Sequence, residues 1–181
     1  MAMRELILGG ARSGKSTLAE QRARDSGLAV SYIATATAGD EEMAARIARH
    51  RARRPSAWGL VEAPLALARA LQTHAAADRC LLVECLTLWL SNLLVPTDAD
   101  PGNAGTHEAV FEREREALLE VLPALPGHII LVSNEVGMGI VPLGALTRRY
   151  RDEAGRLHQQ LATLVDRVTL VVAGLAQTLK G

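Results

Sequence analysis

Aromatic residues and net charge are both scarce in this chain. Phe, Trp and Tyr make up 3% of its 181 residues, so few rings are available to stack on the bases of a single-stranded nucleic acid. The 20 basic and 20 acidic side chains cancel, and a formal net charge of zero argues against a broad basic surface for DNA or RNA. We therefore expect no nucleic-acid partner.

Cysteines and long apolar runs are scarce as well. Cys80 and Cys85 lie in one apolar stretch, where buried free thiols are expected rather than a disulfide framework or a zinc site. No apolar run reaches the roughly 20 residues that span a bilayer. The N-terminus also lacks the basic region, apolar core and cleavage site of a signal peptide. We expect a cytoplasmic protein with no membrane span.

The size and pattern of the chain favour one α/β domain, assigned to residues 1–181. Strands are expected at residues 6–8, 28–34, 58–62, 80–84, 129–133 and 168–173, the last being the final element. Helices are expected at residues 16–24, 40–54, 64–74, 86–94, 108–122 and 146–165, and loops at 95–106 and 134–143. Because the strands are apolar throughout, the pattern indicates a mostly parallel central sheet flanked by helices on both faces.

A phosphate-binding loop is the most specific motif. The segment GGARSGKS matches G-x-x-x-x-G-K-[ST] and stands between a predicted strand and a predicted helix. Its glycines let successive N–H groups point at phosphate oxygens, and the helix adds its positive end. Lys15 can reach the outer phosphates, and the Ser16 hydroxyl can bind Mg²⁺. The predicted nucleotide-binding residues are Gly9, Gly10, Ala11, Arg12, Ser13, Gly14, Lys15 and Ser16, and Lys15 is also predicted to be catalytic.

Two carboxylates stand at the ends of other predicted strands. Glu84 follows the apolar run 80–83, and we expect it to hold Mg²⁺ together with Ser16, directly or through water. Glu62 ends the strand before it. The pattern does not choose there between a contact to a ribose hydroxyl or purine N–H and a solvated strand end.

An arginine-rich segment follows in the predicted helix 40–54. Arg46, His50 and Arg54 are spaced four residues apart and therefore share one face, bordered by Arg49 and Arg53. Repulsion on this face would be relieved by a bound triphosphate, and a neutral His50 could attack its α-phosphorus. The charge pattern alone slightly favours a solvated basic face instead. The other histidines are expected at the surface or at helix ends: His74, His107, His128 and His158.

Five segments together resemble one enzyme family. They are GGARSGKS (9–16), YIATA (32–36), DEEMAARIARHRARRP (40–55), LLVEC (81–85) and SNEVGMGIVP (133–142). Nearly the whole chain is similar to the bifunctional adenosylcobinamide kinase/adenosylcobinamide-phosphate guanylyltransferase of cobalamin biosynthesis. The H-R-x-x-R-P and N-E-V-G-M-G-I-V-P stretches are far more specific than the phosphate loop. Some relatives have two adjacent histidines where this chain has Arg49 and His50.

The resemblance implies two reactions. The family phosphorylates the hydroxyl of adenosylcobinamide with ATP or GTP, then transfers GMP from GTP to the product through a guanylylated histidine and releases pyrophosphate. By position that catalytic histidine is His50. The resemblance further implies a RecA-like phosphate-loop fold, a homotrimer and additional nucleotide contacts. Those contacts are Ala34, Thr35, Ala36, Arg51, Ala52, Arg53, Arg54, Glu62 and Glu84.

Other functions share part of this pattern. A small-molecule kinase of another pathway would use the phosphate loop and give no role to the arginine segment. A regulatory switch protein specific for guanine would normally carry N-K-x-D, which the sequence lacks. A DNA-binding ATPase is disfavoured by the neutral charge. The loop 134–142 follows a strand at its carboxyl end, where open α/β sheets bind ligands, and is predicted to help form the corrinoid site.

Overall fold

The computed structural model describes residues 2–37, 55–95 and 104–181. The predicted helix 40–54 and most of the predicted loop 95–106 lie outside these residues. The elements in chain order are β1 (Met3–Gly9), α1 (Lys15–Asp25), β2 (Ala29–Ala34), β3 (Gly59–Glu62), α3 (Leu67–His74), β4 (Arg79–Glu84), α4 (Leu86–Leu94), α5 (Ala104–Val121), a 3₁₀ turn (Leu122–Ala124), β5 (His128–Asn134), α6 (Ala145–Leu164), β6 (Arg167–Val172) and β7 (Leu175–Lys180).

The strands form one seven-stranded sheet in the order β3-β2-β4-β5-β1-β6-β7. Every pair is parallel except β6 and β7, which are antiparallel. This sheet confirms the predicted α/β fold. One strand, β5, lies between the phosphate-loop strand β1 and the strand β4 that ends at Glu84.

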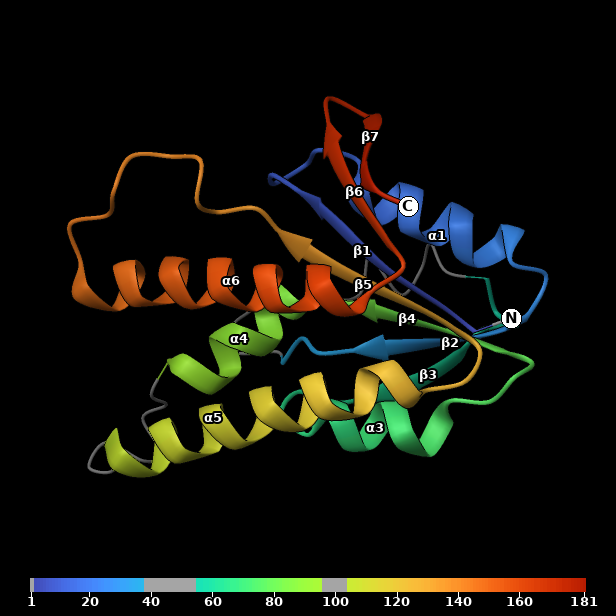
Figure 1. Ribbon diagram of the computed structural model, residues 1–181, viewed down its shortest axis with the longest axis horizontal. Coiled ribbons are helices and arrows are strands. Elements are labelled where there is room, and N and C mark those ends of the chain that lie inside the picture. The colour runs from blue at the N-terminus through green and yellow to red at the C-terminus, as the bar shows by residue number, and fades with distance from the viewer. Residues whose placement is uncertain (1, 38–54, 96–103) are drawn as a thin grey trace.

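Helices cover both faces of the sheet, as the apolar strands predicted. Figure 1 shows α1 on one face and α3, α4, α5 and α6 on the other. The side chains alternate accordingly. In β5, Ile129 and Leu131 belong to the larger core with Trp89 of α4, whereas Ile130 and Val132 belong to the smaller core under α1. None of the described helices is long and apolar enough to cross a membrane.

Two helix boundaries differ from the prediction. The helix α3 begins at Leu67 rather than at Pro64, because the carbonyl groups of Pro64 and Leu65 accept hydrogen bonds from the side chains of Asn92 and Trp89. The helix α5 begins at Ala104, inside the segment predicted as a loop.

One strand of the sheet was not predicted from the sequence. A seventh strand, β7, follows β6 through a two-residue turn in which Ala173 and Gly174 have φ angles of 52° and 79°. All six residues of β7 are exposed. With no buried apolar face, the strand left no pattern for a prediction to detect.

Candidate active site

The phosphate loop curls between the end of β1 and the start of α1. The Ser13 N–H donates to the Gly10 carbonyl over 3.2 Å, and α1 begins at Lys15. Two residues take left-handed backbone conformations, Arg12 with φ 57° and Gly14 with φ 100°. An arginine in that region is uncommon, and such conformations cluster where backbone groups meet a ligand.

Glycine is required at the first position of the loop by contacts on two sides. A Cβ on Gly9 would lie 2.5 Å from Ser13 Oγ and 2.6 Å from the Val171 carbonyl oxygen of β6. The Lys15 side chain is buried and folds back over the loop, where its Nζ donates to the Gly10 carbonyl over 3.2 Å. The ammonium group therefore lies where it could meet a phosphate without a large movement.

Ser16 and Glu84, the two predicted Mg²⁺ ligands, are in direct contact. The Ser16 hydroxyl donates to Glu84 Oε1 over 2.6 Å. Burial raises the pKa of Glu84 to about 7, although the Ser16 hydrogen bond and the charge of Lys15 oppose the rise. A cation bound next to this buried carboxyl group would lower its pKa and stabilise the ionised form.

The Ser16 hydroxyl and the Glu84 carboxylate offer oxygen atoms that suit Mg²⁺. This ion prefers oxygen ligands and usually binds only one or two protein carboxylates. Among the described residues no three His, Cys, Asp or Glu side chains come together to form a metal cage.

The carboxyl ends of β3, β2 and β4 lie side by side and form a row of strand ends. Ala34 pairs with Glu62 on β3 and with Glu84 on β4, so both carboxylate residues flank the end of β2. Thr35 is fully buried. Its hydroxyl donates to the Cys85 carbonyl over 2.7 Å and accepts from the Cys85 N–H over 2.9 Å. Its side chain thus holds the backbone of the row in place.

Asn92 is a residue of this site that the sequence analysis missed. Its Nδ2 donates to the carbonyl groups of Thr35, over 2.8 Å, and Pro64, over 3.0 Å. One amide on α4 thereby ties the segment after β2 to the segment after β3. A single asparagine inside an apolar helical run carries no motif that could have indicated this role.

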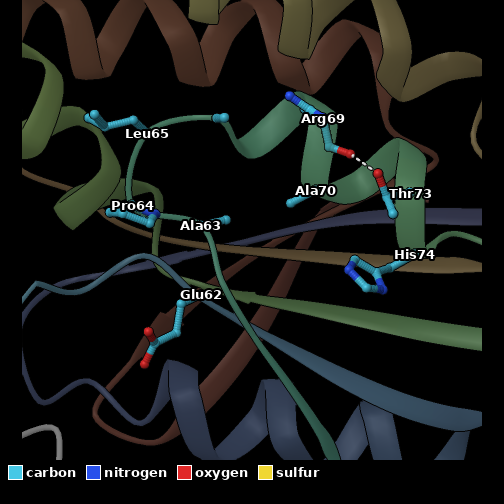
Figure 2. Close-up of a pocket in the computed structure, with 9 residues that line it drawn as sticks. Glu62, Ala63, Pro64, Leu65, Arg69, Ala70, Thr73 and His74 are labelled. Atoms are coloured by element: carbon cyan, nitrogen blue, oxygen red, sulfur yellow. Dashed lines mark hydrogen bonds between the residues drawn. The ribbon is translucent and has the colours of Figure 1, made fainter.

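Glu62 lies at the rim of a cavity of about 380 Å³ between β3 and α3. Figure 2 shows its carboxylate directed away from α3, whose residues Arg69, Thr73 and His74 line the other side. No residue of the phosphate loop lines this cavity.

The loop after β5 begins with an anchored glutamate. The Glu135 N–H donates to the Gly9 carbonyl over 3.1 Å, and its Oε1 accepts from the Gly137 N–H over 2.5 Å. Beyond this anchor several large apolar side chains are exposed, among them Ile140 and Leu143, at 97% and 98%.

The prediction of a surface or helix-end position was wrong for His158. This side chain on α6 is buried, with Nε2 2.8 Å from Ser133 Oγ and Nδ1 3.8 Å from Glu135 Oε2. It lies on the inward face of an amphipathic helix, and a polar partner on β5 makes that burial tolerable. His50, Arg51, Ala52, Arg53 and Arg54 lie outside the described residues.

A family model described as "Cobinamide kinase / cobinamide phosphate guanyltransferase" matches residues 5–179. The chain belongs to this family. It is a cobinamide kinase and cobinamide phosphate guanylyltransferase of adenosylcobalamin biosynthesis, as the resemblance implied. A kinase of another pathway and a non-catalytic switch protein are thereby ruled out.

Named relatives of this kinase and guanylyltransferase match over almost their full length. It is 63% identical to the bifunctional adenosylcobalamin biosynthesis protein CobP of Pseudomonas aeruginosa over 179 residues, covering 99% of this chain and 98% of that protein. It is 41% and 40% identical to the CobU proteins of Escherichia coli and Salmonella typhimurium, covering 97% of this chain and 98% of each. Among solved structures, the RadB recombinase is similar at a TM-score of 0.47 and 18% identity, covering 93% of this chain and 73% of that one.

Family membership makes a nucleoside triphosphate and cobinamide the substrates of this enzyme. The described half of its site has the groups that such substrates need. The Lys15 ammonium lies over the loop 9–16, and the Ser16–Glu84 pair carries oxygen atoms of the kind that bind a cation.

Proposed function

We propose that one nucleotide site, built on residues 9–16 with Glu84, serves both reactions, and that His50 carries GMP between them. The observation that supports this most directly is the 2.6 Å contact between Ser16 and Glu84, two oxygen-bearing side chains that would bind Mg²⁺ within the influence of the Lys15 charge. Residues 1–181 would form one nucleotide-binding domain. The enzyme would work in the cytoplasm as a homotrimer with Mg²⁺ as its metal.

In the kinase step the hydroxyl oxygen of adenosylcobinamide attacks the γ-phosphorus of ATP or GTP. A P–O bond forms to the corrinoid, the bond to the nucleoside diphosphate breaks, and the hydroxyl proton passes to solvent water. The loop N–H groups and Lys15 stabilise charge on the transferred group. Bound Mg²⁺ would supply further positive charge from its position at Ser16 and Glu84.

In the second step a nitrogen of His50 attacks the α-phosphorus of GTP, and the bond to pyrophosphate breaks. Arg51, Arg53 and Arg54 would offset the charge of the departing pyrophosphate. A phosphate oxygen of adenosylcobinamide phosphate then attacks the same phosphorus. The P–N bond breaks, and the product is adenosylcobinamide-GDP with free His50.

The row of strand ends would bind the rest of the nucleotide. Ala34, Thr35 and Ala36 would line this part of the site. Thr35 would support it from beneath, because it is fully buried and its hydroxyl and carbonyl are already engaged with Cys85 and Asn92. The Glu62 carboxylate, directed away from α3, would accept from a ribose hydroxyl or a purine N–H.

The exposed loop after Glu135 would receive the corrinoid. Met138, Ile140 and Leu143 are exposed by 80%, 97% and 98%, and a cluster of exposed apolar side chains marks an interaction surface. A large ring system with apolar edges is the kind of partner such a surface suits.

The experiment uses the full-length enzyme with Mg²⁺ and GTP labelled on the α-phosphate, followed by denaturation and measurement of retained label. We expect acid-labile, base-stable label on the wild type and none on His50→Ala. His74→Ala removes an exposed histidine at the end of α3 and should retain the label. A wild type that phosphorylates cobinamide without retaining label would contradict the histidine mechanism. Light scattering of the same preparation tests the homotrimer.

A further inference from the structure

The turn between β6 and β7 is packed against the phosphate loop. The Gly174 N–H donates to the Ser13 carbonyl over 2.8 Å. A Cβ added to Gly14 would lie 3.2 Å from Gly174 Cα, so the two backbones approach almost as closely as glycine allows. The hairpin and the loop therefore meet through main-chain atoms on both sides.

The outer strand of this hairpin adds little to the core. All six residues of β7 are exposed, and Leu175 is exposed by 75%. The far end of the hairpin is held by Lys180, whose Nζ donates to the carbonyl groups of Ala162, over 2.8 Å, and Val165, over 2.6 Å, at the end of α6. The strand β7 is therefore fixed at both ends although none of its side chains is buried, which indicates a role other than apolar burial.

The geometry of the peptide bond suggests that role. A trans peptide is planar, and its C=O and N–H groups point in opposite directions. When Gly174 holds the Ser13 carbonyl on the hairpin side, the N–H of Gly14 must point the opposite way, toward the inside of the loop. Within the described residues this N–H has no acceptor, so it is available to a phosphate oxygen.

We propose that Gly174 is a positioning residue for nucleotide binding, which acts by fixing the orientation of the Ser13–Gly14 peptide. It touches no substrate itself. This inference rests on the proposed nucleotide site at residues 9–16, and wild-type binding of GTP is therefore measured first.

The chain offers a matched control. Gly174 and Gly27 are both exposed turn glycines with positive φ, at 79° and 68°, and a Cβ at either would meet nothing within 4 Å. Alanine strains the backbone at both positions. Only Gly174 contacts the phosphate loop, so a general loss of stability and a specific loss of binding can be separated.

The experiment measures the dissociation constant of a fluorescent GTP analogue with Mg²⁺, and KM for cobinamide, in the full-length enzyme. We expect Gly174→Ala to weaken nucleotide binding about five- to tenfold, the range of one net hydrogen bond, with KM for cobinamide unchanged. Gly27→Ala should bind within twofold of wild type after a similar drop in Tm. Gly174→Asn should be close to wild type, since asparagine tolerates the left-handed conformation.

Two results would overturn the inference: unchanged nucleotide binding in Gly174→Ala and in the more strained Gly174→Val, or an equal loss of binding in Gly27→Ala. A wild-type enzyme that binds no GTP would contradict the proposed nucleotide site as well. Normal binding by wild type and all variants would reject only the role of Gly174.

Discussion

The Ser16 hydroxyl donates to Glu84 Oε1 over 2.6 Å and so connects the first turn of α1 to the end of β4, 68 residues away in the chain. The strands that lead to these two residues are not neighbours, because β5 lies between β1 and β4. The contact therefore crosses the middle of the sheet edge, where the phosphate groups of a nucleotide would lie.

Ser16→Ala and Glu84→Gln should each slow phosphoryl transfer about a hundredfold and raise the Mg²⁺ concentration needed for half-maximal rate. Ser16→Ala removes one of the proposed oxygen ligands, and Glu84→Gln replaces a charged carboxylate by a neutral amide. Steady-state kinase assays over a Mg²⁺ series measure both effects. Ser91→Ala, on the half-buried side of α4, serves as the control and should behave as wild type. An unchanged Mg²⁺ requirement in both variants would exclude this pair as the metal site.

Asn92→Ala should lower the free energy of unfolding by about 1–3 kcal/mol, since it leaves the carbonyl groups of Thr35 and Pro64 without their donor. It should also weaken nucleotide binding, because the segments after β2 and β3 lose their common anchor. Denaturant titration and GTP binding test the two effects. Gln159→Ala removes an exposed amide from α6 and should change stability by less than about 0.5 kcal/mol. A stable Asn92→Ala enzyme with normal binding would show that the amide is dispensable.

Glu135→Ala should raise KM for cobinamide about five- to tenfold and leave the nucleotide KM unchanged. The Gly137 N–H loses its acceptor, and the exposed apolar loop loses its fixed start. Glu135→Gln retains an acceptor oxygen and should restore most of the affinity. Glu116→Ala, at an exposed position on α5, is the control. Equal effects on both substrates would point to a general disturbance of the Gly9 contact instead.

Stability should depend on pH through His158. Burial lowers the pKa of His158 below 6.5, although Glu135 acts in the opposite direction. The unfolded chain then binds a proton more readily than the folded protein, so stability is fully present above pH 6.5 and falls as the pH drops below it.

The test compares the unfolding free energy of wild type and His158→Gln between pH 5 and pH 8, at about the range where histidine titrates. The difference between the two curves should shrink as the pH falls. The difference is needed because burial and the charges of Arg167 and Arg22 also lower the pKa of His128, which contributes equally to both proteins. Parallel curves would mean that His158 does not change its proton affinity on folding.

Most of the fold could be predicted from the sequence because buried parallel strands can be recognised as short apolar runs. The segment 80–84 is such a run, and the strand β4 at Arg79–Glu84 confirms it. The strand β7 was not predicted, because none of its side chains is buried and its sequence therefore has no apolar run. The start of α3 was predicted too early because the side chains that bond the carbonyl groups of Pro64 and Leu65 come from the distant helix α4.

In the candidate site, too, some residues could be predicted from local sequence patterns and others could not. Local spacing predicted the phosphate loop, and the ends of predicted strands suggested Glu62 and Glu84 as further site residues. Asn92, Gly174 and the pairing of His158 with Ser133 depend on contacts between distant segments. A single sequence carries no signal for such contacts, because any polar residue on a helix is compatible with solvent exposure.

The two tryptophans of the chain lie on opposite faces of the sheet. Trp89 is wholly buried in the larger core under α4, with its indole N–H donated to the Leu65 carbonyl over 2.7 Å. Trp58 packs against the smaller core on the α1 side, with the Arg24 guanidinium 5.8 Å from its ring centroid. Each face thus carries its own fluorophore. Single-tryptophan proteins made with Trp58→Phe or Trp89→Phe would each report on one face of the sheet. The wavelength of their fluorescence maximum during unfolding would show whether the two faces unfold together or one after the other.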